Sequence, residues 1–162
     1  VPMVVYDPRL PEEQRGKVTF VVEQGEARRQ TLHWLMTAKS EWAERTGHKT
    51  PWLKDGSGER FLTAVLELPD GPESLVATLR CDDRIVAAVF CLRGGDALYV
   101  SKIAHDPSFA AYSPGRSLLM MLMELAFAEG IALVDLMAGG VEWKHRFATG
   151  QSALVMQKVR LR

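Results

Sequence analysis

The sequence predicts an α/β (α+β) protein in which a mixed, mostly antiparallel sheet packs on a central buried helix. Three β-type runs, at about 74–81, 84–92 and 97–104, are joined by tight turns and predict an antiparallel meander. A strongly apolar helical run follows at 114–129, opening at a Ser-Pro-Gly loop. The apolar run 131–138 comes directly after this helix, and that order favours a strand parallel to its neighbour.

The first half of the chain predicts two helices and one strand. Residues 17–22 form a short β-rich run, and a helical pattern extends from about 26 to 45 and ends at Gly47. Trp34 and Trp42 are expected to cap its apolar face. A second helix is predicted at 59–68, and a last strand at 152–161.

Length and composition indicate one domain with a sizeable core. Residues 1–16, rich in proline and charge, are expected to be a lead-in or linker, and residues 17–162 a single domain. The start lacks an initiator Met, which fits a fragment or the C-terminal part of a longer two-domain protein. Twenty basic and twenty acidic residues cancel, so any site for a polyanion must be local.

The apolar runs, cysteines and histidines of the sequence bear on where the protein is located and on whether it binds a metal. The longest apolar run is interrupted by Glu124, and we expect no membrane insertion. Cys81 and Cys91 lie in strand-like runs and are interpreted as core thiols, which fits a cytoplasmic protein. Four scattered histidines and these two cysteines do not have ligand spacing, so no metal is predicted.

The loop before the apolar helix has the composition of an anion site. Ser113 suits the N-cap and Pro114 the first helical turn, while Gly115 permits close approach to a ligand. Free amide hydrogens and the positive end of the helix dipole would then face the loop, with the charge of Arg116 beside them. The alternative is an ordinary helix start whose amides bind water.

Two motifs in matching order resemble the GNAT-superfamily acyltransferases, in the FemAB-like and CelD-like branch associated with cellulose biosynthesis. The resemblance covers about residues 28–150. The residues that carry the first motif are Asp106, Ser113, Pro114, Gly115, Leu118 and Leu119. Those of the second motif are Asp135, Leu136, Gly139, Trp143 and Lys144.

This resemblance implies an acyl-CoA held between two diverging strands, with its pyrophosphate on the helix N-terminus. It implies that Ser113, Pro114, Gly115, Arg116, Ser117 and Leu118 form the pyrophosphate site, and that Ser101 and Ile103 present backbone groups to the pantetheine arm. The chain departs from the common loop, with Ala110 in place of Arg or Gln and Ser113 in place of the first glycine. In the second motif Met137 replaces a small residue and Trp143 a tyrosine.

Four polar side chains are candidates for the chemistry. Asp135 lies in an apolar run, so it has either a site role or a structural partner such as Lys144 or Arg146. Lys144 could anchor an acyl carbonyl, a phosphate or Asp135, or lie at the surface. His105 is a candidate general base and Tyr112 a candidate acid, unless they are simply loop residues. Tryptophans 34, 42, 52 and 143 could line an acceptor pocket or belong to the core.

The expected function is transfer of an acyl group from acyl-CoA to an amine of a small molecule, sugar or cell-envelope precursor, with acetyl-CoA as the expected donor. One alternative is a catalytically silent GNAT-like module that binds a ligand or partner. Another is a FemAB-type transferase that uses aminoacyl-tRNA, although the neutral chain does not favour nucleic acid. The oligomeric state, acyl length and acceptor stay open.

Overall fold

The computed structural model describes residues 17–139 and 141–153. The predicted lead-in 1–16 and nearly all of the predicted last strand lie outside these residues. The elements follow in the order β1 (Val18–Val22), α1 (Glu26–Thr46), α2 (Pro51–Lys54), α3 (Ser57–Glu67), β2 (Glu73–Cys81), β3 (Arg84–Gly94), β4 (Ala97–His105), η2 (Pro107–Tyr112), α4 (Pro114–Ala128), β5 (Leu133–Asp135) and α5 (Glu142–Phe147).

The described strands form one five-stranded sheet in the order of the sequence. β1 to β4 pair antiparallel, and β5 pairs parallel to β4, so the predicted meander and parallel strand are both confirmed. The apolar run 131–138 is typical of a fully buried strand, and this prediction was wrong: β5 is only three residues long, and Leu133 is exposed. β5 is the edge of the described sheet.

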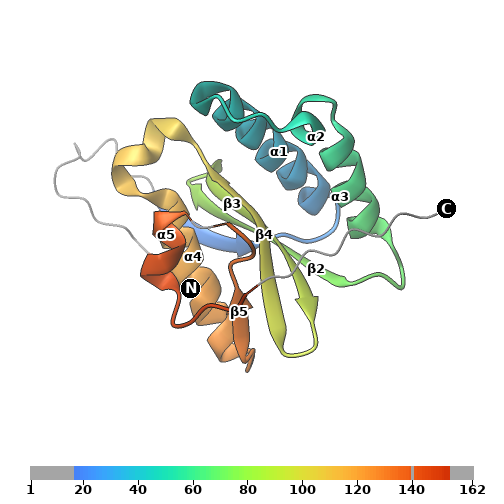
Figure 1. Cartoon of the computed structure of the whole chain (residues 1–162), viewed down its shortest axis with the longest axis vertical. Helices are drawn as coiled ribbons and strands as arrows, with labels where there is room; N and C mark the ends of the chain where they lie inside the picture. Colours follow the sequence, from blue (N-terminus) through green and yellow to red (C-terminus); the bar gives the residue numbers. More distant parts are fainter. Residues whose placement is uncertain (1–16, 140, 154–162) are drawn as a thin grey trace.

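Helices cover both faces of the sheet, α1, α2 and α3 on one and α4 on the other (Figure 1). The α1 side buries Leu32, Leu35 and Leu62 with Val76 and Phe90 of the strands. The α4 side is lined by a second set, which includes Leu79, Val89, Leu98, Leu118 and Leu122. This division follows from the alternation of side chains along each strand.

One extra residue in β4 reverses that alternation. Phe90 of β3 pairs with Lys102, whereas Cys91 pairs with Val100, so Ser101 is left over as a bulge. Before the bulge Val100 packs in the α4 cluster; after it Ala104 packs in the α1 cluster. The end of β4 therefore contributes side chains to both layers.

Three short elements were not expected: α2, η2 and α5. Each has four to six residues, too short for a clear hydrophobic period. The apolar composition of α4 predicts cover on most of its sides, and this prediction was also wrong. Met120 and Phe127 are exposed, because α4 packs on one layer only. Among the described residues, no helix is both long and apolar enough to cross a bilayer.

The first prediction tests the core. Replacing the fully buried Phe90 by alanine leaves a cavity between the sheet and α1, and should lower the free energy of unfolding by about 3–5 kcal/mol. Phe127→Ala is the matched control, because this side chain is 87% exposed and its loss should change stability by less than about 0.5 kcal/mol. Urea denaturation measures both, and similar losses for the two variants would contradict the packing described.

Candidate active site

The sheet opens between β4 and β5. The parallel pairing joins only Ala97, Leu98 and Tyr99 to Leu133, Val134 and Asp135. Beyond Tyr99, β4 continues to His105 and pairs, among the described strands, with β3 alone. Its backbone groups on the other edge are therefore available to a ligand.

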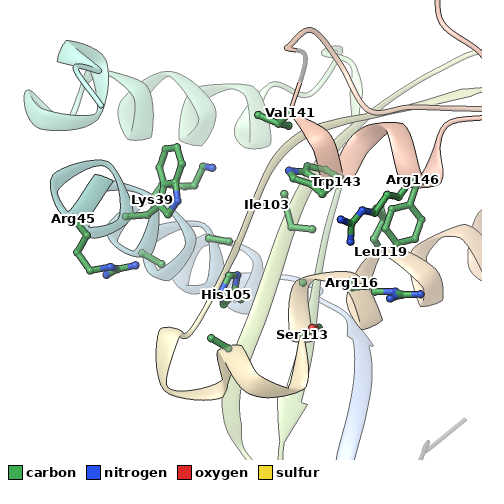
Figure 2. A pocket seen from close by; sticks show the side chains of 16 residues that line it. Lys39, Arg45, Ile103, His105, Ser113, Arg116, Leu119, Val141, Trp143 and Arg146 are labelled. Carbon is green, nitrogen blue, oxygen red and sulfur yellow. The ribbon is translucent and has the colours of Figure 1, made fainter. Parts of the chain in front are cut away.

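A cavity of about 630 Å³ lies at this end of β4. Its walls come from α1, the end of β4, the loop and first turns of α4, and α5 (Figure 2). The residues that line it are Ala38, Lys39, Trp42, Arg45, Ile103, Ala104, His105, Ala110, Ser113, Gly115, Arg116, Leu119, Val141, Trp143, Arg146 and Phe147. The Ser-Pro-Gly corner thus faces a crevice beside the diverging strands.

The start of α4 offers fewer free amides than the sequence predicted. Ser113 occupies the N-cap position in a left-handed conformation (φ 50°, ψ 51°), and its hydroxyl does not cap the helix. Its own N–H donates to Ala110, and its carbonyl accepts from both Arg116 and Ser117. Pro114 has no N–H. Of this turn, only the Gly115 N–H finds no acceptor among the described residues, because η2 takes the Ser113 N–H and the Ser113 carbonyl takes those of Arg116 and Ser117.

Asp106 shapes the loop that leads to this corner. One carboxylate oxygen accepts from the Ser108 N–H at 2.9 Å and the other from Arg84 at 2.6 Å. Burial raises the pKa of Asp106, but hydrogen bonds from the Ser108 hydroxyl and N–H, together with Arg84, hold it below its usual value. The first motif's aspartate is therefore a structural residue of η2.

His105 lies in the cavity beside the start of α4. A Cβ atom on Gly115 would come within 3.7 Å of the His105 Nδ1. Partial burial lowers the pKa of His105 below its ordinary value; Arg45 and Lys39 lower it further, and Asp106 acts in the opposite sense. The imidazole is therefore neutral near pH 7 and able to accept a proton.

Asp135 and Lys144 do not line the cavity but hold the loop that borders it. The Asp135 carboxylate accepts from the Met137 N–H at 2.6 Å, and Met137 is left-handed, with φ 62°. Lys144 donates to the carbonyls of Met137 and Ala138 at 3.1 and 2.8 Å. Burial lowers the pKa of Lys144, while the charge of Asp135 raises it.

Some of the other predicted residues line the cavity, and the rest lie in the elements around it. Ile103, Ser113, Gly115 and Arg116 line the cavity. Pro114 and Leu118 are buried, Ser117 is half-buried in α4, Ser101 is the β4 bulge, and Tyr112 is exposed on η2. Of the tryptophans, 42 and 143 line the cavity, 34 packs on the α1 core, and Lys102 lies over the ring of Trp52.

Sequence reasoning predicted Arg116 but missed the other three cations of the cavity. Lys39 and Arg45 come from α1, and Arg146 from α5. Spacing could have placed Lys39, Trp42 and Arg45 on neighbouring turns of one helix, but not opposite the α4 corner. The buried Cys91 is no nucleophile, because burial raises the pKa of its thiol to about 12. In the described parts of the chain, no three His, Cys, Asp or Glu side chains group as metal ligands.

Solved structures of acetyltransferases share this fold. An aminoglycoside acetyltransferase from an uncultured soil metagenomic sample, in complex with sisomicin, is 15% identical with a TM-score of 0.60, over 90% of this chain and 97% of the other. The PaiA N-acetyltransferase of Thermoplasma acidophilum, in complex with coenzyme A, is 13% identical with a TM-score of 0.53, over 71% and 75%. The ribosomal-protein-alanine N-acetyltransferase of Brucella melitensis biovar Abortus 2308 is 15% identical with a TM-score of 0.58, over 88% and 99%.

Comparison with curated proteins gives no match. The family model described as an acetyltransferase (GNAT) domain matches residues 9–145, which is most of the chain and includes every residue that lines the cavity except Arg146 and Phe147. The match begins inside the segment predicted to be a lead-in. The open edge of β4, the cavity beside α4 and this match agree with one another: the chain belongs to the GNAT family of acetyltransferases.

Proposed function

We propose that this chain transfers the acetyl group of acetyl-CoA to the amine of a small-molecule acceptor in the cavity beside β4. GNAT acetyltransferases use acetyl-CoA, and the solved neighbours include a coenzyme A complex and an aminoglycoside acetyltransferase. The observation that carries the proposal is the position of the α4 N-terminus, which opens into the cavity where β4 has lost its partner.

The donor's pyrophosphate fits the α4 corner. Gly115 supplies a free N–H and leaves room for close approach, Arg116 supplies a charge, and the helix dipole adds to both. Ser113, Pro114, Ser117 and Leu118 would act by setting the shape of this first turn. The pantetheine arm would follow the open edge of β4 along Ile103 towards Ser101, where backbone groups can pair with its amides.

His105 is the proposed general base. The neutral acceptor amine attacks the thioester carbonyl, the C–S bond breaks, and the proton of the new amide nitrogen passes to His105 directly or through water. The departing thiolate takes a proton from solvent or from Tyr112, which lies on η2 at the edge of the loop. General-base catalysis of this kind contributes roughly 10²–10⁴-fold to a rate.

Asp135 and Lys144 are proposed as positioning residues. They fix the turn at Met137 and Ala138, and thereby the approach to α5, which carries Trp143 and Arg146 to the cavity. In this proposal the second motif sets the shape of one wall of the cavity.

The branch of the family, the acceptor class and the location of the protein are also proposals. The Ser-Pro-Gly and Asp-Leu…Lys motifs support the FemAB-like and CelD-like branch, with a sugar or envelope precursor among the candidate acceptors and a cytoplasmic location. Membership of an acetyltransferase family favours an enzyme over a silent binding module. Transfer from aminoacyl-tRNA would predict binding that weakens steeply with salt.

Gly115→Val tests the donor site. The branched side chain would extend beyond the Cβ position towards His105 and the free N–H, so acetyl-CoA affinity should fall at least about tenfold, the loss expected for one hydrogen bond to a charged group. Gly115→Ala is the matched control, because its Cβ makes only ordinary contact with His105 and affinity should change little. Calorimetry measures binding, and circular dichroism checks the fold; unchanged affinity in Gly115→Val would remove this corner from the site.

His105→Gln tests the base. The substitution should lower kcat about 100-fold or more and leave the KM for acetyl-CoA within a few-fold. Because the pKa of His105 lies below its ordinary value, the wild-type kcat/KM should fall only as the pH drops below about 6.5, and the variant should lack that limb. His145→Gln, at an exposed position of α5 outside the cavity lining, is the control. A raised KM for acetyl-CoA with an unchanged kcat would make His105 a donor contact instead.

A further inference from the structure

We propose that the acceptor is an anionic amine, a molecule whose carboxylate or phosphate binds to Lys39 and Arg45 while its amine reaches the acetyl group. The inference rests on the proposed function and specifies its substrate class. It begins with the charges of the cavity. Four cationic side chains line it, together with His105, and no aspartate or glutamate of the described residues does. The whole chain is neutral, so this excess of positive charge is local.

These cations are mostly unpaired. Arg146 forms an ion pair with Glu142 one turn away on α5. Within residues 17–139 and 141–153, no carboxylate pairs with Lys39, Arg45 or Arg116. Lys39 is half-buried and lies 4.5 Å over the Trp42 ring, whereas Arg45 and Arg116 are exposed. A half-buried ammonium group without a carboxylate is costly, and an anionic ligand would offset that cost at Lys39.

The cations occupy two opposite walls, as Figure 2 shows. Arg116 and Arg146 lie on the side of α4 and α5, next to the helix terminus assigned to the donor pyrophosphate. Lys39 and Arg45 project from α1 on the other side, with His105 between the two groups. Because the proposed function places the donor's pyrophosphate at the α4 corner, the α1 cations remain available to bind a second anion.

Further positive charge near Lys39 comes from β4 and α5. Burial lowers the pKa of Lys39, and the charges of Lys102 and Lys144 lower it further. Lys102 is half-buried as well, and it stacks over Trp52 rather than on a carboxylate. Ala38 and Trp42 form the apolar part of the α1 wall, so the acceptor should carry an apolar segment beside its anionic group.

This environment also selects the reactive form of the acceptor. Nearby positive charges lower the pKa of a bound ammonium group, which favours the neutral amine that attacks the thioester. An acceptor with several ammonium groups and no anion would be repelled by the same cations.

The experiment compares amines that differ only in the anion. The pairs are L-phenylalanine with L-phenylalaninamide, and glucosamine 6-phosphate with glucosamine; sisomicin serves as a polycation. Release of the CoA thiol gives kcat/KM, corrected for the fraction of neutral amine at the assay pH. At least one anionic member should exceed its uncharged partner about tenfold or more, and the pair that does so identifies carboxylate or phosphate. Equal rates within both pairs, acetylation of no amine, or preference for sisomicin would overturn the inference.

Charge-removing variants then locate the effect. Lys39→Gln and Arg45→Gln should each raise the KM of the preferred anionic acceptor about tenfold and leave the KM of acetyl-CoA unchanged. Arg116→Gln should do the reverse. Arg29→Gln removes the same charge from α1 outside the cavity and should change neither constant. If Lys39→Gln and Arg45→Gln raise only the KM of acetyl-CoA, these cations bind the donor and the inference fails while the acetyltransferase function stands. Absence of acetyl-CoA binding by calorimetry would overturn both.

Discussion

The parallel ladder between β4 and β5 ends at Tyr99 and Asp135, and the candidate site depends on this early end. If the two strands had stayed paired to His105, the edge of β4 would be filled with strand hydrogen bonds and no cavity could reach it. Because β5 leaves after three residues, the chain returns to the cavity as α5 and closes it from a third side. The energetic cost is an unpaired stretch of backbone, which an amide-bearing ligand could satisfy.

Local patterns predicted the elements well. The turn residues at 82–83 and 94–96 divided the meander correctly, and Gly47 ends α1 in the left-handed conformation that a C-terminal glycine favours. The strand after α4 was predicted parallel and is parallel, although it is shorter than its apolar run. The resemblance to GNAT enzymes, which rested on two motifs, is confirmed at the level of the family.

The site was predicted only in part, because its contacts join distant segments. The α4 corner and His105 were predicted and lie together, but Lys39 and Arg45 are some 60–80 residues away along the chain. No local period places α1 across from α4. The number of free amides was also beyond the sequence, since it depends on the left-handed Ser113, whose N–H bonds to η2 and whose carbonyl accepts from Arg116 and Ser117.

Both motif aspartates have the same local role. Asp106 accepts from the N–H of Ser108, and Asp135 accepts from the N–H of Met137, so each carboxylate closes a turn two residues ahead. One turn precedes α4 and the other precedes α5, the two helices that flank the cavity. A carboxylate in a motif can thus preserve the course of the backbone around a reaction without touching a reactant.

The bulge at Ser101 limits the insertions and deletions that β4 can accept in evolution. Val100 and Ala104 pack on opposite layers only because the bulge lies between them. Loss of that single position would turn Ile103, Ala104 and His105 over together, moving the Ile103 and Ala104 side chains to the wrong layer and the imidazole away from α4. Substitutions can therefore accumulate here one by one, whereas a change in length would have to be tolerated by the hydrophobic interior and the candidate site at the same moment.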